Sequence, residues 1–177
     1  MKKETGAKLM IMDADVVSTE ATGNGRPGAK VDRILYDGDT VELGGSKLVA
    51  HLTPGHTKGC TTWTMVVDEG GRKLNAVIIG SANVNAGTYL VGNKNYPQIA
   101  DDYMKTFKVL KSLPCDLFLG AHGNNFGLLA KLPKMKAGSP NPLIDPAGYK
   151  AYVVDREAAF LNELDRQKKN PGSPSAR

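Results

Sequence analysis

Cysteine, histidine and tryptophan are scarce in this sequence. Its 177 residues include two cysteines, three histidines and one tryptophan. At most one disulfide is possible, and a single pair does not set a redox compartment. Long apolar runs are also missing, since none approaches the ~20 residues that a membrane-spanning helix needs. The apolar fraction of 41% is ordinary for a globular protein, and the length allows one domain with its own core.

The sequence also lacks a concentrated basic region, although its formal net charge is +5. Its lysines are scattered, no element combines them with interleaved aromatic residues, and no nucleic-acid-binding motif is present. A solvated basic surface is therefore the preferred interpretation, with no nucleic-acid partner.

The first residues of the sequence are MKKETGAKLMIM. They contain lysines and a short apolar run but no small-residue cleavage site, so we predict no signal peptide in this chain.

Short β-type runs dominate the first half of the sequence. A buried strand is predicted at residues 8–12, followed by one or two helical turns and a glycine-rich loop. The runs RILY and TVEL flank Asp37-Gly38, a dipeptide typical of a tight hairpin. A second hairpin is predicted for residues 61–67 and 74–79, joined by Asp-Glu-Gly-Gly.

The apolar spacing changes to a helical period in the second half. A helix is predicted over residues 97–111, with aspartates in its first turns and lysines later, and a short strand over 116–119. Asp145-Pro146 predicts the start of a last helix. The fold class is therefore α/β or α+β, built in layers. We predict one domain over residues 1–169 and a disordered tail over 170–177.

Two of the three histidines follow predicted strands and are surrounded by small residues. His56 lies in TPGHTKGCTTW (53–63) and His122 in LGAHGNN (119–125), whereas His51 lies inside a β run and is interpreted as structural. Loops at strand ends are common positions for functional groups, and neutral imidazole is a frequent metal ligand. Alternatively, His56 and His122 are ordinary loop histidines that bind no metal.

These motifs resemble the metallo-β-lactamase family, most closely the third subclass of its class B enzymes. TPGHTKGCTTW, VIIGSANVNAG (77–87) and FLGAHGNNFGL (118–128) occur in the family's order and approximate spacing. The resemblance implies an αββα sandwich, of which this chain holds mostly the second half, a mixed β-sheet with flanking helices. It also implies a site with two zinc ions, in which His56 is a ligand of the first zinc and His122 a ligand of the second.

Ser81 distinguishes among the subclasses that this family contains. Many hydrolases of this fold have a metal-bridging Asp at this position, and the first β-lactamase subclass has a Cys ligand. A serine hydroxyl is a poor zinc ligand beside either group. The resemblance to the third subclass implies that Ser81 binds the substrate carboxylate, and Asn83 could assist as an amide donor. If the family resemblance is set aside, the side chains of Ser81 and Asn83 could simply form hydrogen bonds to the backbone of their own loop.

Cys115 matches a position that forms a disulfide in some members of the family, but residues 141–152 contain no cysteine. Cys60 and Cys115 are therefore interpreted as buried thiols.

The family's main metal-binding motif is not present. Members normally carry a His-x-His-x-Asp-His motif and a further His, and this sequence contains neither. A catalytic zinc generally needs three protein ligands, so no catalytic site is complete in this chain, and we expect it to be truncated and inactive alone. We also expect self-association through a sheet face that the first half of the sandwich would cover.

Three functions therefore remain open from the sequence. The first is hydrolysis of a β-lactam by the complete parent enzyme, which the resemblance places in the bacterial periplasm. The second is hydrolysis of another ester, thioester or lactone by the same fold, which Ser81 disfavours. The third is a non-catalytic half-domain that binds or pairs.

Overall fold

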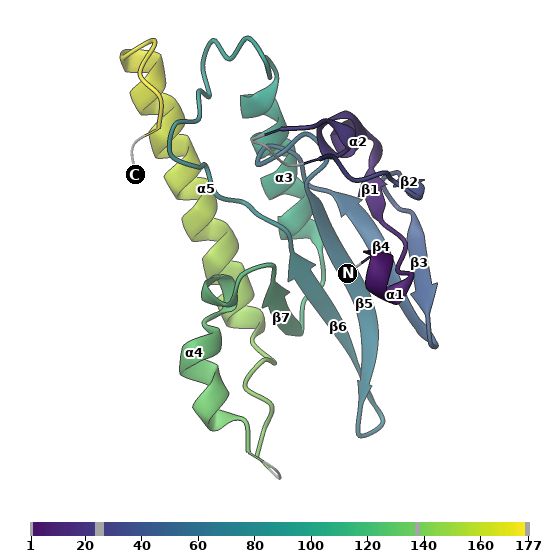
Figure 1. Cartoon of the computed structure of the whole chain (residues 1–177). Helices are drawn as coiled ribbons and strands as arrows, with labels where there is room; N and C mark the ends of the chain where they lie inside the picture. Colours follow the sequence, from purple (N-terminus) through teal and green to yellow (C-terminus); the bar gives the residue numbers. More distant parts are fainter. Residues whose placement is uncertain (1, 24–26, 137–138, 176–177) are drawn as a thin grey trace.

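The computed structural model describes residues 2–23, 27–136 and 139–175, and its central element is a five-stranded mixed sheet. The strand order is β3-β4-β5-β6-β7, in which β3 to β6 are antiparallel neighbours and β7 pairs parallel with β6 (Figure 1). The strands are β3 (Thr40–Leu43), β4 (Ser46–Leu52), β5 (Thr61–Glu69), β6 (Arg72–Ile79) and β7 (Leu117–Gly120). The predicted α/β class with a mixed sheet and flanking helices is confirmed.

The hairpin between β5 and β6 forms where the sequence predicts it. Gly70 and Gly71 have φ values of 62° and 85°, which glycine adopts without steric cost. The Asp68 carboxylate accepts a hydrogen bond of 2.8 Å from the Gly71 amide and so closes the turn. The long ladder that follows pairs Glu69 with Arg72 and continues to Trp63 opposite Ile78.

The predicted hairpin at Asp37-Gly38 is wrong. The strand before it, β2 (Arg33–Leu35), pairs parallel with β1 (Met10–Met12) in a separate two-stranded sheet, and the strand after it, β3, pairs with β4. Asp37 accepts a hydrogen bond of 2.7 Å from the Leu52 amide, and the Gly38 amide donates to the Ala50 carbonyl. The turn therefore fastens the chain to β4 as it passes from one sheet to the other.

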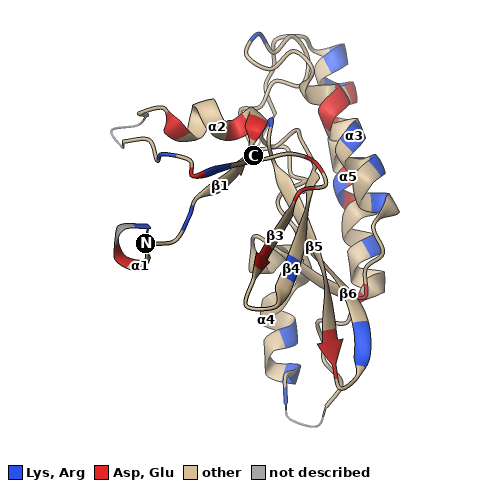
Figure 2. Ribbon diagram, turned by 90° about the vertical axis from the view of Figure 1, so that its right-hand side faces the viewer, with Lys and Arg blue, Asp and Glu red and all other residues tan. Residues whose placement is uncertain are grey.

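The small sheet and its helices cover part of one face of the large sheet. Met12 and Leu35 pack on Ala50 of β4, with Trp63 of β5 at the margin. The short helices α1 (Lys2–Thr5) and α2 (Asp13–Glu20) belong to this layer. Figure 2 shows β1 and α2 on one side of the large sheet and the long helices on the other.

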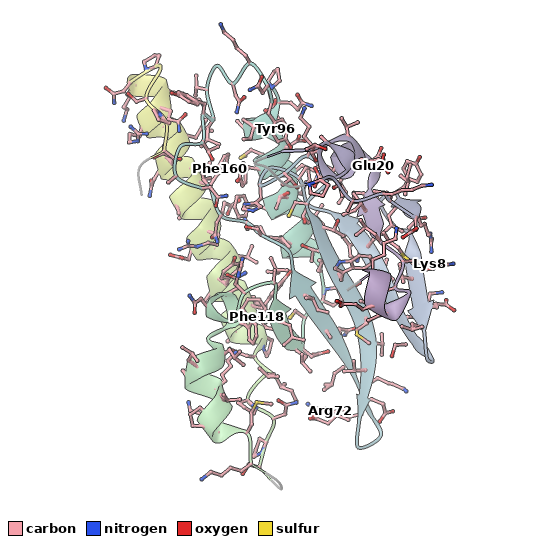
Figure 3. All side chains as sticks on the ribbon, viewed as in Figure 1. Lys8, Glu20, Arg72, Tyr96, Phe118 and Phe160 are labelled. Atoms are coloured by element: carbon pink, nitrogen blue, oxygen red, sulfur yellow. The ribbon has the colours of Figure 1, made fainter. Side chains whose placement is uncertain are left out.

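The main core lies between the opposite face of the sheet and two helices, α3 (Ile99–Ser112) and α5 (Pro146–Lys169). The Phe160 ring of α5 stacks on Tyr103 with centroids 5.1 Å apart and lies 5.7 Å from Phe107, both on α3. Phe118 of β7 packs edge-on against Tyr149. Figure 3 labels Phe118 and Phe160, which both lie in this layer. The predicted cap of α5 is confirmed, since the Asp145 carboxylate accepts the Gly148 amide at 2.8 Å.

Residues 170–175, for which the sequence predicts a disordered tail, lie against the loop between β6 and α3. Ser175 is 7% exposed, and its amide donates to the Thr88 carbonyl at 2.9 Å. Gln167, near the end of α5, is fully buried and its amide oxygen accepts the Leu90 amide at 2.7 Å. The polar groups of Ser175 thus form hydrogen bonds with backbone groups of that loop. Residues 176 and 177 lie outside the described residues.

The described part of the segment between β7 and α5 contains three short helices: η1 (Gly123–Phe126), α4 (Leu128–Lys131) and η2 (Leu132–Lys134). None of the helices in the described ranges is long and apolar enough to cross a membrane. Both cysteines are free thiols, with Cys60 buried beside β5 and Cys115 half-buried before β7.

Candidate functional site

The sheet topology brings three loops to one edge of the molecule. β4 and β6 run in the same direction because each is antiparallel to β5, and β7 is parallel to β6. The C-terminal ends of these three strands therefore point to the same edge. The loops that follow them carry His56, Ser81 and His122 respectively. The common direction of β4, β6 and β7 therefore places all three of these predicted site residues at the same edge of the sheet.

The His56 loop is buried on both sides of its exposed tip. Pro54, Gly55 and Gly59 are buried, whereas His56 is exposed together with its two following neighbours. The Nδ1 atom of His56 lies 3.3 Å from the Asn83 carbonyl oxygen. A proton on Nδ1 would be donated to this carbonyl, and Nε2 would then carry the lone pair that a metal requires. Nε2 forms no hydrogen bond within the part of the chain that the structure describes.

Helix α3 fixes the first part of this loop. The Thr106 hydroxyl donates to the Pro54 carbonyl at 2.5 Å, and the Tyr103 hydroxyl donates to the Asn83 carbonyl at 2.7 Å. A Cβ atom at Gly55 would lie 2.7 Å from Cγ of Tyr103, and its φ of 128° also favours glycine. Burial raises the pKa of Tyr103 well above its usual value, so its hydroxyl stays protonated as a donor. The helix around Tyr103 is predicted from the sequence, whereas its contact with the Asn83 carbonyl depends on the fold.

Ser81 and Asn83 follow β6, and their side chains differ in surroundings. Ser81 is half-buried, and its Oγ accepts a long hydrogen bond of 3.4 Å from the Asn83 amide. The side-chain oxygen of Asn83 accepts a hydrogen bond of 3.3 Å from Arg156 on α5. The structure therefore places the Asn83 side chain toward α5, and Ser81 next to it at the strand end. Their predicted role in substrate binding remains a prediction.

His122 is exposed at the end of β7. Its carbonyl accepts the Asn125 amide at 3.0 Å, which starts the turn η1, and Phe126 of that turn packs on Phe118 with ring centroids 6.3 Å apart. A Cβ atom at Gly120 would lie 3.0 Å from Cβ of Asn125, so the turn approaches the strand closely. The imidazole therefore stands on a turn that is tied to the core.

His51 is in a different environment from the other two histidines. Its Nε2 lies 2.7 Å from the Thr64 hydroxyl on the neighbouring strand, and burial lowers its pKa. It lines a cavity of about 360 Å³ with Val49, Leu113 and other residues, below the end of α3. The ring forms a cross-strand contact.

A zinc ion at this edge would require more ligands than the described residues provide. Among residues 2–23, 27–136 and 139–175, no group of three or more His, Cys, Asp or Glu side chains could hold a metal ion. Three protein ligands are the usual minimum for a catalytic zinc. His56 and His122 have the chemistry of single ligands, and no catalytic step through a metal follows from these residues alone.

Solved structures of known enzymes match this fold closely, although no protein-family model matches the sequence. The metallo-β-lactamase FEZ-1 from Legionella gormanii is 45% identical with a TM-score of 0.90, over 94% of this chain and 68% of its own. The subclass B3 metallo-β-lactamase BJP-1 of Bradyrhizobium japonicum is 37% identical with a TM-score of 0.87, over 95% and 67%. A metallo-β-lactamase from Cronobacter sakazakii, a HARLDQ motif mutant, is 31% identical with a TM-score of 0.85, over 96% and 69%.

The match covers nearly all of this chain and the C-terminal portion of each neighbour. Sequence identity and coverage at this level indicate membership of the same family and not only a shared fold. The predicted resemblance is confirmed. The chain belongs to the metallo-β-lactamase family, with neighbours in its class B3.

Proposed function

We propose that this chain carries part of a zinc-dependent site for β-lactam hydrolysis. In this proposal His56 is a ligand of one zinc ion and His122 a ligand of a second. Ser81 binds the carboxylate of the β-lactam, and Asn83 assists it. The observation that supports the proposal most is the common edge of β4, β6 and β7, after which these residues lie. The complete enzyme would act in the bacterial periplasm, as the family resemblance implies.

The number of ligands limits what the chain does alone. Each zinc ion would receive one protein ligand here, whereas a catalytic zinc generally has three plus a water molecule. The other ligands must come from residues outside this sequence, and we therefore propose that the chain alone is inactive. Two exposed imidazoles on anchored loops would still bind a divalent metal weakly.

A first experiment tests the chain as it is. The purified protein is dialysed against zinc, its metal content is measured, and turnover of a penicillin and a cephalosporin is followed. We expect substoichiometric zinc, reduced further in His56→Ala and His122→Ala but not in the control His51→Ala, and no turnover. A stoichiometric pair of zinc ions with hydrolysis by the unaided chain would contradict the proposal.

A second experiment tests the chemistry of the site. The third of FEZ-1 that this chain does not cover would be fused to it, which the 45% identity makes practicable. We expect the chimera to hydrolyse β-lactams and to lose that activity in His56→Ala and His122→Ala. Thioester or lactone turnover in place of β-lactam turnover would favour the second hydrolase function. A folded chimera without zinc or turnover would favour a non-catalytic half-domain.

The choice of β-lactam over other substrates depends on Ser81. A neutral hydroxyl there leaves a position that can donate to a substrate anion, whereas a carboxylate would repel it. Ser81→Asp in the chimera should therefore raise KM for β-lactams more than it lowers kcat. Unchanged KM would remove the assigned role of Ser81.

A further inference from the structure

Helix α2 is attached to the His56 loop mainly through one carboxylate. No residue of α2 is fully buried, so its own side chains contribute little apolar packing. Asp15 accepts two hydrogen bonds from the loop: Oδ1 accepts the Gly59 amide at 2.8 Å and Oδ2 accepts the Thr57 hydroxyl at 2.5 Å. Figure 2 shows α2 with red acidic segments at both of its ends, one of them beside the end of the sheet.

The loop approaches α2 closely enough to require glycine at this contact. A Cβ atom at Gly59 would lie 2.8 Å from Cγ of Asp15 and 2.9 Å from Cβ of Met12. Both neighbours would have to move, and the carboxylate would lose its place. Gly59 is therefore needed for space and not for an unusual φ angle.

His56 lies between two fixed points of its loop. On one side, α3 holds Pro54 through Thr106, as described above. On the other side, Asp15 holds Thr57 and Gly59. Hydrogen bonds to a carboxylate are shorter and stronger than those between neutral groups, so this second fixed point is well defined. The backbone of His56 can then move little relative to the sheet edge.

We propose that Asp15 is a positioning residue for His56: by holding Thr57 and Gly59, which follow His56 in the loop, it sets the direction of the imidazole toward the metal. This inference rests on the proposed function, in which His56 is a ligand. Groups that orient metal ligands typically contribute about 10- to 100-fold to metal affinity. Asp15 acts through the loop backbone and the Thr57 hydroxyl, without touching the imidazole.

The test compares the wild-type chain with Asp15→Ala, Asp15→Asn and the control Asp13→Ala. Asp13 lies on the same helix and carries the same charge, but among the described residues its carboxylate accepts only from the neighbouring Ala14 amide. Co²⁺ is added at constant pH, and the paramagnetic broadening of each histidine ring signal is recorded by NMR. His122, on another loop, is the internal control for changes in the whole fold.

We expect Asp15→Ala to require about tenfold more Co²⁺ to broaden the His56 signal, with His122 unchanged. Asp15→Asn keeps an acceptor and should recover part of the loss, and Asp13→Ala should match the wild type. Hydrogen exchange of the Gly59 amide should accelerate in Asp15→Ala alone. If the His56 response stays within about twofold of the wild type while Gly59 exchange accelerates, Asp15 is only structural and the inference is overturned.

A failure of the proposed function gives a different pattern. Neither histidine of the wild type would then respond to Co²⁺, and the assignment of both as ligands would fail. The positioning of His56 is still decided by its ring chemical shifts and its NOE contacts to Asn83 without metal. If these change in Asp15→Ala but not in Asp13→Ala, Asp15 orients the ring; if they do not change, the inference is overturned.

Discussion

Gln167→Met removes one of the few fully buried polar side chains while keeping its length and volume. The native amide oxygen accepts from the Leu90 amide at 2.7 Å and the Val91 amide at 3.3 Å. The native amide nitrogen donates to the Thr88 carbonyl at 3.0 Å and to Glu163 at 2.7 Å.

The expected cost follows from which partners keep another hydrogen bond. The Thr88 carbonyl keeps the Ser175 amide, and Glu163 keeps Arg166. The Leu90 amide, in a buried bond, and the Val91 amide, in a longer and half-buried bond, both lose this acceptor, and the buried Leu90 donor sets the cost. One buried unsatisfied donor costs about 1–3 kcal/mol, so we expect a loss of about 2 kcal/mol in the free energy of unfolding.

Urea unfolding at a fixed protein concentration measures this loss. With a slope of about 1–3 kcal/mol per molar urea, a loss of about 2 kcal/mol lowers the midpoint by roughly 1 M. Asn162→Met, at an exposed position of the same helix, is the matched control. If the midpoint of Gln167→Met lies within about 0.2 M of this control, the reasoning on the Leu90 donor is refuted.

Three further predictions concern the core, the cap of α5 and the exposed sheet. Phe160→Ala should cost about 3–5 kcal/mol, since the ring is fully buried and stacks on Tyr103, and a loss below about 1 kcal/mol in urea unfolding would contradict this. Lys131 holds the pKa of Asp145 below its usual range, so this group stabilises the fold above about pH 4 and its contribution is lost as pH falls through the folded-state pKa. Asp145→Ala should cost about 1 kcal/mol near neutral pH, and unfolding at about pH 6 and pH 3 should differ less than in the wild type. The half-covered sheet face around Trp63 should cause self-association, which sedimentation at several concentrations would detect; a monomer with a concentration-independent unfolding midpoint would refute it.

Local patterns predicted the elements whose stability is local. The β5–β6 hairpin and helix α3 lie where turn residues and apolar spacing place them, because the two glycines and the apolar stripe determine these elements directly. The positions of His56, Ser81 and His122 at strand ends also follow from short motifs. The sequence could indicate that each lies after a strand, and the strand directions place them at one edge.

Other features depend on partners far away in the chain. Asp37-Gly38 has hairpin composition, but Leu52 and Ala50 bind the turn, so the flanking strands enter different sheets. Residues 170–175 look disordered because they are polar and rich in proline and glycine, and their hydrogen-bond partners are backbone groups of the loop near Thr88. Likewise, no local pattern in the sequence indicates a role for Asp15, because its partner Gly59 is distant in the chain.

The two free thiols provide a chemical reporter of how often the chain opens. Burial raises the pKa of Cys60, and that of Cys115 to about 12, so the reactive thiolate is rare in the folded protein at neutral pH. Alkylation should then proceed only from opened molecules, at a rate set by the opening equilibrium. Because Cys60 lies before β5 and Cys115 before β7, mass spectrometry of the modified peptides would distinguish release of the His56 loop from release of the last strand.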